Sequence, residues 1–477
     1  MEDIVPVAPV VVAIPAGAYH VPASMRNRAI WIILGAALLP RIWLLAAGWN
    51  HPGRFLTPDS HGYDSLARAL LERGQFSRSP ERGPEIFRTP GYPAFLAAVY
   101  GLTGGSVHAA VAVQVAADVV LCLLVYLLGR RLCSRGVGLL AAAIQAASPA
   151  AVAASVRLLS ESLFALLLTA AVLLLIHFFR TSRWWAVLAA GGLTGLACLV
   201  RPIAGPFALV VAGLLLAARW KRPQWAGLFL LAAAACAAPW IARNYAVTRP
   251  RYAGLSSVGD INLLLYNALE LAESDPAIEL TPAQRALKSE WEASGQGLAK
   301  CLLKNSSDYA LRCRREGWAL IRRHPGRYAA LHLRTTMNCF LPAATDVLEV
   351  AGITAGNRGT LAVLRREGII AAVRHYFGGR LWPLWLCAPM VLITLGKHVG
   401  AMLGAARHVR MRMGPAGWLI LLTILYFVLV PGPVAHARFR VPVEPLLSLA
   451  AAAGLAYLGE FLRAAARRRH RPSAPGA

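Results

Sequence analysis

The sequence predicts an all-α polytopic membrane protein, a bundle of about ten transmembrane helices with amphipathic helices on one surface. Hydrophobic residues make up 57% of the 477-residue chain and charged residues only 15%, which is far more apolar than a soluble globular protein. The apolar residues fall into runs of roughly 20, the length at which a helix crosses the hydrocarbon core. The formal net charge of +26 lies mostly in short clusters between these runs. It therefore indicates membrane topology and not a nucleic-acid-binding face.

Ten apolar runs are candidate spans, and every second connection between them is basic. Cytoplasmic helix ends retain Lys and Arg, so the basic connections mark the inside face and place both termini there. The marking residues include Arg28, Arg130, Arg180, Lys221, Lys397, Arg407 and Arg463. The spans are roughly 28–48, 107–128, 136–155, 159–179, 184–200, 203–218, 224–242, 381–397, 416–431 and 441–462.

This alternation divides the chain into five regions, two of which present large segments to the outside. The regions are a flexible cytoplasmic tail at 1–27, an N-terminal transmembrane module at 28–243 with a first outside loop at 49–105, a long outside segment at 244–380, C-terminal transmembrane helices at 381–462 and a basic cytoplasmic tail at 463–477.

Both outside segments have helical apolar spacing. The apolar residues from Tyr63 to Leu71 recur at helical intervals and end before Gly74, which predicts an amphipathic helix on the membrane surface. Pro90 then marks the start of the next helical piece. In the long segment, residues 318–321 and 328–333 predict further surface helices.

The first outside loop brings two carboxylates, Asp59 and Asp64, to the membrane surface together with His61. A carboxylate in this position fits a general base that takes a proton from an attacking hydroxyl or amine. Asp59 is the first candidate for this role and Asp64 the second. The alternative for Asp59 is helix capping, because Pro58-Asp59-Ser60 also has the pattern of a helix start.

Arg88 follows in the same loop and begins the sequence Arg-Thr-Pro-Gly-Tyr-Pro. An arginine can bind a phosphate or a carboxylate through a fork of donors, and the Pro-Gly-Tyr-Pro turn would present it. The alternative is a structural turn in which Arg88 pairs with Asp59 or Asp64.

Two further acids lie in or beside the spans. Glu161, at the outside start of the fourth span, avoids the full cost of burial in hydrocarbon and could face a cavity. Its alternative is an ion pair with Arg157 one helical turn away. Asp118 lies within the second span, where a hydrogen bond inside the bundle is favoured over a proton relay.

Several cations lie at predicted outside helix ends, although Lys and Arg are favoured at cytoplasmic ends. We therefore expect them to have an anionic partner. Arg201 follows the fifth span, Arg243 ends the seventh, and His436, Arg438 and Arg440 precede the tenth. In an extended segment the last three would point to one side and form a cationic pocket at headgroup level, suited to a lipid-linked phosphate. The alternative is that these arginines snorkel.

These features in order are similar to the GT-C superfamily of integral-membrane glycosyltransferases. The likeness is to bacterial members of the protein O-mannosyltransferase and lipid A aminoarabinose transferase type, which are glycosyltransferase family 39-like, and it covers roughly 28–460. It rests on Asp59, the Arg-x-Pro-x-Tyr-Pro element at 88–93, Ser160-Glu161, Arg201-Pro202 and Arg-Phe-Arg-Val-Pro-x-x-Pro at 438–445.

The resemblance implies an inverting sugar transfer from a polyprenyl-phosphate donor to a glycan, lipid or protein acceptor at the periplasmic face of a bacterial inner membrane. It maps the essential acid to Asp59. Many relatives have a second acid where this chain has Ser60, so Asp59 acts alone or with Asp64. The competing class is a transporter or flippase of a lipid-linked anion, which would place its polar groups near the bilayer midplane.

Cofactors and partners follow from the same features. The eight cysteines form no Cys-x-x-Cys pair, so neither a zinc site nor a redox motif is indicated. No cofactor is assigned, and a divalent metal ion is left open. The expected partners are the lipid-linked donor, the acceptor and membrane lipids, but not nucleic acid.

Overall fold

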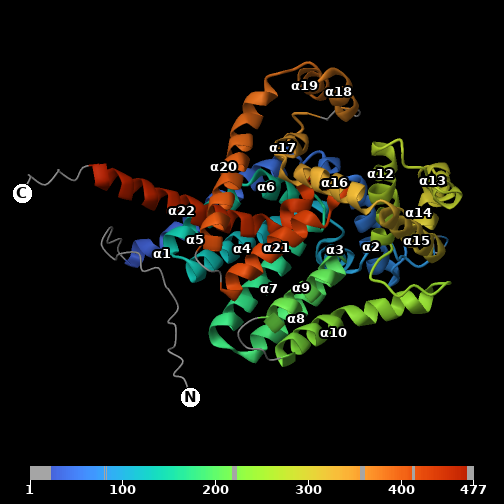
Figure 1. The fold of residues 1–477 in the computed structure, drawn as a ribbon, viewed down its shortest axis with the longest axis horizontal. Coiled ribbons are helices and arrows are strands. Elements are labelled where there is room, and N and C mark those ends of the chain that lie inside the picture. The colour runs from blue at the N-terminus through green and yellow to red at the C-terminus, as the bar shows by residue number, and fades with distance from the viewer. Residues whose placement is uncertain are drawn as a thin grey trace, which may run out of the picture.

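The computed structural model describes residues 23–79, 81, 83–217, 223–354, 360–410 and 414–469, and its regular elements across these residues are helices (Figure 1). The helices of the apolar bundle are α1 (Ala23–Ala47), α4 (Val107–Leu132), α5 (Arg135–Ala146), α6 (Pro149–Val156), α7 (Glu161–Thr181), α8 (Trp184–Val200), α9 (Ala204–Ala217), α10 (Pro223–Val247), α20 (Pro383–Arg410), α21 (Pro415–Leu429) and α22 (Glu444–Arg469). The predicted all-α bundle is therefore confirmed.

Shorter helices fill the segments between these. They are η1 (Pro52–Phe55), α2 (Pro58–Arg73), α3 (Gly91–Thr103), α11 (Val258–Asn262), the π-helical η3 (Leu263–Ala268), α12 (Leu269–Ser274), α13 (Pro282–Ala293), α14 (Leu298–Lys304), α15 (Ser307–Arg323), α16 (Pro325–Thr336), η4 (Met337–Phe340), α17 (Ala344–Val350), α18 (Thr360–Glu367), α19 (Ile369–Tyr376), η5 (Gly432–Val434) and η6 (Ala437–Val443).

The helices make this a multi-pass integral membrane protein. Within the described residues, six helical segments are long and apolar enough to cross a membrane, or seven if α5 and α6, bent by 56° at their junction, count as one span. The other apolar helices, α8, α9 and α21, have 17, 14 and 15 residues and are shorter than the roughly 20 that a span needs. Each of the ten predicted runs is helical, but the count of about ten exceeds what helix length supports.

The surface helices predicted outside the bundle are confirmed as helices. α2 ends at Arg73, and the following Gly74 adopts a left-handed φ of 65° that a glycine accepts without strain. Pro90 is the N-cap of α3. The two predicted helices of the long segment fall in α15 and α16.

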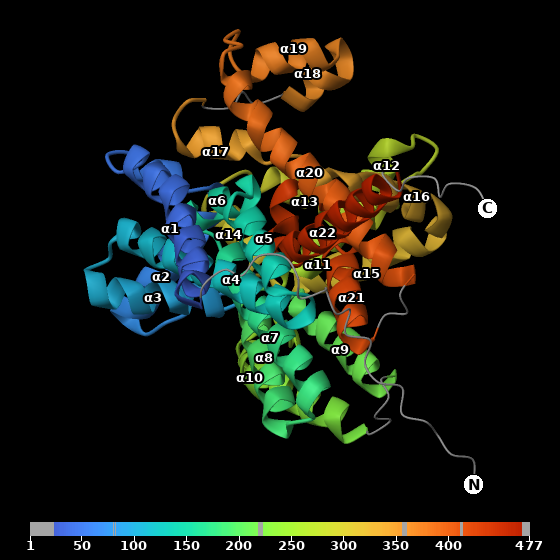
Figure 2. The same ribbon diagram turned by 90° about the vertical axis from the view of Figure 1, so that its left-hand side faces the viewer.

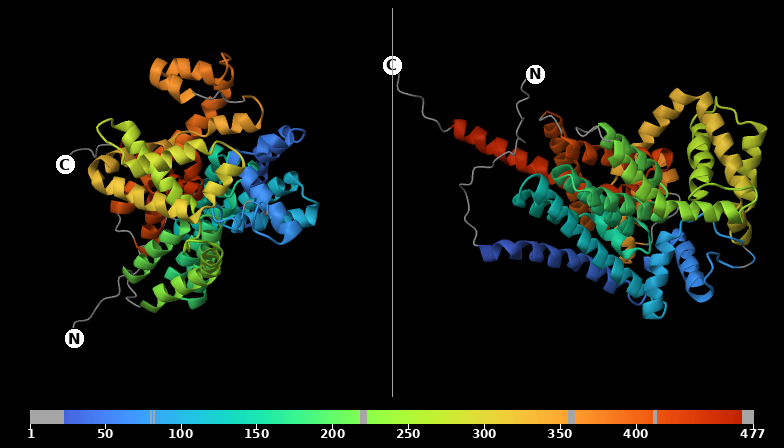
Figure 3. Two further views of the ribbon diagram at one scale, coloured as in Figure 1. Left: turned by 90° about the vertical axis from the view of Figure 1, so that its right-hand side faces the viewer. Right: turned by 90° about the horizontal axis from the view of Figure 1, so that it is seen from below.

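Helices α12 to α15 gather at one end of the molecule. The start of α1 and the end of α22 lie at the left of Figure 1, whereas α12 to α15 lie at the right, and the view from below in Figure 3 agrees. These right-hand helices have an apolar core of their own, which includes Tyr252, Ile261, Leu264, Leu320 and Ile321. Both ends of the described chain therefore lie on the side opposite to this subdomain. α18 and α19 form a separate pair beside the start of α20 (Figure 2).

Helices α20 and α22 cross with little space between their backbones. A Cβ atom added at Gly404 would collide with the carbonyl oxygen of Ala450, and one added at Gly454 would collide with that of Gly400. Small residues at such crossings let membrane helices approach closely. This crossing brings Lys397 of α20 to Glu444, the first residue of α22.

Buried ion pairs lie inside the bundle. Asp118 accepts from Arg41 Nε at 2.8 Å, and Arg41 also donates to the carbonyl of Ala146 at 3.1 Å. The predicted hydrogen bond inside the bundle is thus confirmed, but its donor is an arginine within the first apolar run. Lys397 is fully buried against Glu444 in the middle of α20, so its use as a marker of the inside face was wrong.

Parts of both predicted tails and of one basic connection lie outside the described residues. The predicted tail at 1–27 lies outside the described residues up to residue 22, and its last five residues already belong to α1. Lys221 lies outside them as well. The basic tail at 463–477 continues α22 as far as Arg469.

Candidate functional site

The capping of α2 leaves the Asp59 side chain free for other contacts. Thr57 is the N-cap, its backbone N–H donates to Ser60 Oγ at 2.9 Å, and the two side chains form a capping box. Asp59 lies between them in the first turn, but its oxygens accept from Arg88 at 2.6 Å and from Arg438 at 2.9 Å. Since Thr57 and Ser60 make the cap, the carboxylate of Asp59 has another role.

Five charged side chains of alternating sign form a continuous chain around Asp59. In order they are Arg88, Asp59, Arg438, Glu161 and Arg201. Arg438 bridges the two acids, with Nη1 on Asp59 and Nε on Glu161, and Arg201 Nη1 lies 2.7 Å from Glu161 Oε1. The chain therefore joins the first outside loop, the start of α7, the end of α8 and η6.

Arg88 is held rigidly at one end of this chain. Its guanidinium carbon lies 4.6 Å from the centre of the Tyr63 ring, and its Nη1 donates to the Tyr63 hydroxyl at 3.2 Å. Its backbone N–H donates to Glu85 at 3.2 Å. The pairing with Asp59 that was one alternative for Arg88 is thus present.

The arginines determine the protonation of Asp59. Burial alone raises the pKa of this carboxyl, but Arg88 and Arg438 act more strongly in the other direction and hold the pKa far below its usual range. The pKa of Arg88 is raised above its ordinary value, because Tyr63 and Asp59 outweigh the effect of burial. Asp59 is therefore ionised at neutral pH, and with both arginines in place it is a weak base.

The segment before α22 is the 3₁₀ helix η6, so the extended backbone under which His436, Arg438 and Arg440 would point to one side is not present. Three residues complete a turn of such a helix, and residues two apart point in very different directions. Arg438 consequently reaches Asp59 and Glu161, whereas Arg440 is fully buried and donates to Glu444 and to the carbonyls of Cys339 and Leu341. Arg438 and Arg440 do not share a pocket.

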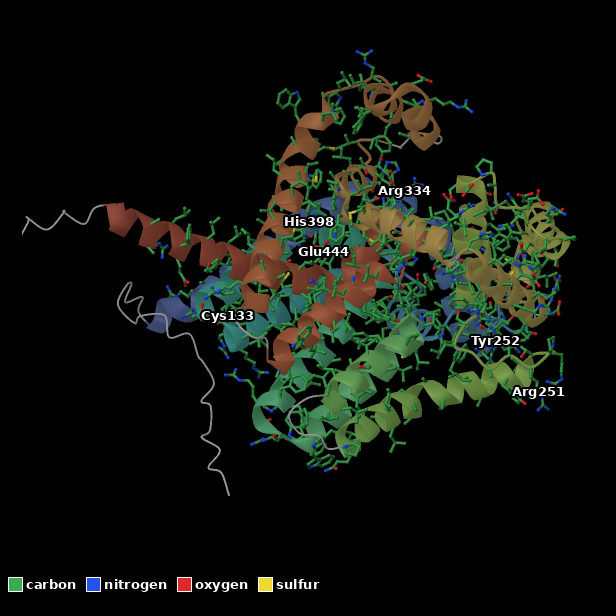
Figure 4. The ribbon with its side chains drawn as sticks, viewed as in Figure 1. Cys133, Arg251, Tyr252, Arg334, His398 and Glu444 are labelled. Atoms are coloured by element: carbon green, nitrogen blue, oxygen red, sulfur yellow. The ribbon has the colours of Figure 1, made fainter. Side chains whose placement is uncertain are left out.

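Arg440 belongs instead to a buried cluster centred on Glu444, the residue labelled near the middle of Figure 4. One oxygen of Glu444 accepts from Arg440, and the other accepts from Lys397 and, at 2.9 Å, from Ser148. His398 follows Lys397 in α20; its Nε2 has no hydrogen-bond partner within the described residues, and its ring lies edge-on to that of Phe340 with centres 5.3 Å apart. This cluster fixes the base of η6, from which Arg438 projects.

A cavity of about 480 Å³ opens beside Arg438. Its size is within the range of ligand pockets, which is roughly 300–1,000 Å³. A second cavity of about 40 Å³ also contacts Arg438 and is lined in addition by Glu161. The larger cavity is lined by Gly53, Arg54, Leu56, Thr57, Pro58, Arg157, Glu349, Thr354, His436, Arg438 and Phe439.

Arg157 lines both cavities and does not pair with Glu161, as the alternative for Glu161 supposed. α6 ends at Val156 and α7 begins at Glu161, so no continuous helix holds the two side chains one turn apart. Arg157 instead donates to Asp346 at 3.1 Å and to Glu349 at 2.8 Å on α17. This contact attaches α17 to the wall of the larger cavity.

Two predicted site residues, Asp64 and Arg243, have partners other than Asp59, and a third, His436, lines the cavities. Asp64 is about 140° around α2 from Asp59, and it accepts from Arg68 at 3.1 Å and from Tyr100 at 2.7 Å. Arg243 donates to the carbonyl of Glu85 at 2.7 Å and so holds the loop before Arg88. His436 is exposed and lines both cavities.

Sequence reasoning missed Arg157, Asp346 and Glu349 as parts of the cavity wall. The spacing of Asp346 and Glu349, three residues apart, places both on one face of a helix and was the available signal. Within the described residues, no group of three or more His, Cys, Asp or Glu side chains could hold a metal ion.

Comparison with a family model supports the predicted resemblance. Residues 87–242 match the family described as dolichyl-phosphate-mannose-protein mannosyltransferase. The matched segment contains Arg88, Glu161 and Arg201 but neither Asp59 nor Arg438. No curated protein matches the chain.

Solved structures with a similar fold include membrane transferases. The oligosaccharyltransferase AglB from Archaeoglobus fulgidus, in complex with an inhibitory peptide and a dolichol-phosphate, matches 95% of this chain with a TM-score of 0.52 and 13% identity. Its apo form matches 96% with a TM-score of 0.50 and 13% identity. The chain spans about half the length of that enzyme, 52% and 53% in the two matches.

ArnT from Cupriavidus metallidurans bound to undecaprenyl phosphate also matches, with a TM-score of 0.39 and 13% identity over 94% of this chain and 81% of ArnT. At such identities the likeness concerns the fold alone.

Proposed function

We propose, from the premise that residues 87–242 form a glycosyltransferase domain of the dolichyl-phosphate-mannose-protein mannosyltransferase family, that the whole chain transfers a sugar from a polyprenyl-phosphate donor. The acceptor is a lipid, glycan or protein, and transfer takes place at the periplasmic face of a bacterial inner membrane. The matched AglB structure in complex with a dolichol-phosphate supports the class of donor.

The observation that carries this proposal is the position of Arg438 between a cavity and two carboxylates. Arg438 lines the cavity of about 480 Å³ and donates to Asp59 at 2.9 Å. A donor whose phosphate lies in the cavity against Arg438 and His436 has its sugar next to Asp59. Arginine suits this task because its planar fork binds phosphate with two parallel hydrogen bonds.

In this mechanism, donor binding prepares the base. The phosphate takes Arg438 away from Asp59, and with one arginine fewer the pKa of Asp59 rises toward the value of an ordinary carboxyl. Arg88 stays with Asp59 and keeps it oriented. A carboxylate that loses one of its two cationic partners is a stronger base.

The chemical step is a single displacement at the anomeric carbon. Asp59 accepts the proton of the acceptor hydroxyl while the oxygen attacks the anomeric carbon from the face opposite to the phosphate. The bond to the acceptor oxygen forms, the bond to the phosphate oxygen breaks, and the electron pair leaves with the polyprenyl phosphate. Arg438 and Arg201 stabilise the negative charge that develops on the leaving phosphate, and the configuration inverts.

An assay in detergent distinguishes this function from transport of the lipid-linked donor. Detergent micelles have no sides, so a transporter produces no new compound there, whereas a transferase still forms a new glycosidic bond. We expect the purified protein to convert undecaprenyl-phosphate-linked sugar to undecaprenyl phosphate when a lipid extract supplies the acceptor, as measured by mass spectrometry. Donor flipping in proteoliposomes without any product in detergent would overturn the proposal.

A further inference from the structure

A second group of cations lies near Asp59 and contributes nothing to the lining of the described cavities. Lys304 is the last residue of α14, and Arg78 lies between α2 and α3. Arg78 Nη2 and Arg88 Nε lie 3.2 Å and 3.8 Å from the position that a Cβ atom would take at Gly62. Arg78 Nη1 donates to Cys301 Sγ on α14 at 3.5 Å. None of the roles proposed above uses Lys304 or Arg78.

The Lys304 ammonium has no anionic partner in the described part of the chain. It lies 5.0 Å from the centre of the Phe87 ring and 5.8 Å from that of Trp291. Burial lowers its pKa most, followed by Arg88 and Arg78, and Asp59 acts in the opposite direction. A half-buried ammonium among like charges is well placed to bind an external anion.

Arg78 lies against α2 within one helical turn of Asp59. Its Nη2 is 3.2 Å from the position that a Cβ atom would take at Gly62, and Gly62 follows Asp59 by three residues. Its Nε donates to Glu85 at 3.1 Å, so the fork is held in place. Gly62 thus lets a second guanidinium approach the helix that carries Asp59.

Tyr266 adds a polar aromatic group from the same subdomain. It lies on the π-helical turn η3, a kind of turn that is frequent at functional sites, and its side chain is 47% exposed. Burial and then Asp59 raise its pKa.

Counting charges gives the sign of the missing ligand. The five linked side chains from Arg88 to Arg201 comprise three arginines and two acids. Arg78, Lys304 and Glu85 together add two cations and one acid, so the whole group has two positive charges in excess. The phosphodiester of a donor supplies one negative charge. One positive charge of this group then remains, and Lys304 is its cation without an ion pair among the described residues.

We propose that Lys304 and Arg78 form an acceptor subsite for an anionic group, so that the acceptor has a phosphate or carboxylate close to its attacking hydroxyl. This inference rests on the proposed transferase function and specifies the class of its acceptor. Arginine offers the anion a fork of donors and lysine a point charge. One oxygen of Asp59 accepts from Arg438 and the other accepts from Arg88, whose Nε lies beside Arg78 at Gly62.

Two lipids that differ in one charged group test the subsite. Oleoyl lysophosphatidic acid and monooleoylglycerol both have a free hydroxyl, but only the first has a phosphate. Their binding to the purified protein saturated with undecaprenyl phosphate is measured without turnover. We expect the wild-type protein to prefer the lysophosphatidic acid by about tenfold or more, the scale of one charge-assisted hydrogen bond. sn-Glycerol 3-phosphate is added as a competitor. Loss of lysophosphatidic acid binding indicates that the subsite takes a soluble anion, and unchanged binding indicates that the anion must be part of a lipid.

Lys304→Gln should abolish the preference, and Lys300→Gln is its matched control. Lys300 is on the same helix, but its ammonium lies over the Trp291 ring at 3.6 Å and donates to the Trp291 carbonyl. Undecaprenyl phosphate should bind all three proteins equally. Equal binding of the two lipids by the wild type would contradict the proposed subsite. A preference for lysophosphatidic acid that persists in Lys304→Gln would contradict it as well. Absence of transfer to every acceptor with the binding preference intact would count against the transferase function instead.

Discussion

Replacing Asp59 by Asn separates its two predicted roles, because Thr57 and Ser60 already cap α2. Asparagine keeps the size and one acceptor oxygen but cannot take a proton. If Asp59 is the general base, we expect turnover to fall about 10²- to 10⁴-fold. Donor affinity should stay equal or increase, since Arg438 no longer has to leave this carboxylate.

The expected cost in stability is small. The Asp59 side chain is 39% exposed and its two ion pairs are therefore screened by solvent. Exposed ion pairs contribute about 0.2–1 kcal/mol each. Arg88 keeps its contact with Tyr63, and Arg438 keeps Glu161. For the two pairs together we expect a free energy of unfolding lower by about 0.4–2 kcal/mol, and a correspondingly small change in Tm.

The pH dependence of that difference has a definite sign. The folded-state pKa of Asp59 is depressed, so ionised Asp59 stabilises the fold above the unfolded pKa of about 3.9. This contribution is lost as the pH falls toward the folded pKa. The Tm difference between Asp59→Asn and wild type should therefore be present at pH 7 and shrink steadily below pH 4.

Asp64→Asn is the matched control for this experiment. It removes a carboxylate from the same helix, but Asp64 pairs with Arg68 and Tyr100 and not with the charged chain. Sugar transfer, donor binding and Tm are measured on both purified variants. Near-normal turnover in Asp59→Asn would refute the argument for Asp59 and make Glu161 the next candidate base.

Three further predictions concern the donor, the bundle and the topology. Arg438→Gln should weaken the binding of undecaprenyl phosphate about 10- to 150-fold, the equivalent of 1.5–3 kcal/mol; unchanged affinity would remove Arg438 from the donor site. Glu444→Gln leaves two buried cations without their shared anion and should destabilise the protein by about 3–5 kcal/mol, seen as a lowered Tm in detergent; an unchanged Tm would show that the cluster is not held by charge. Cysteines placed at Ser79 and Ser294 should react with an impermeant maleimide in intact cells. The exposed native Cys133, which lies in a basic connection, should not react. Protection of either new cysteine would contradict the predicted topology.

Local patterns predicted the contacts that lie close together in the sequence. Asp59 and Arg88 are 29 residues apart within one loop, so their pairing could be proposed from the sequence. The partner of both acids, Arg438, is 379 residues from Asp59, and only tertiary packing brings it there. The sequence placed Arg438 on the same face of the membrane but could not assign its contacts.

Predictions failed where they assumed the wrong local backbone. A continuous helix through Arg157 and Glu161 would have paired these residues, but the chain breaks between α6 and α7. An extended segment would have placed Arg438 and Arg440 together, but the 3₁₀ helix separates them. Side-chain direction depends on backbone period, and a short irregular segment gives no periodic pattern from which to determine that period.

The alternating charges also bear on how a strongly acidic carboxyl can serve as a base. At rest, three arginines face two carboxylates around Asp59, with one positive charge in excess. A donor phosphodiester supplies one negative charge, after which each acid can keep one arginine while Arg438 binds the phosphate. Among these five residues Asp59 then keeps Arg88 as its cationic partner, and its pKa rises because one of its two stabilising charges is gone. On this argument the basicity of Asp59 depends on the presence of the donor, so the proton acceptor forms when there is a sugar to transfer.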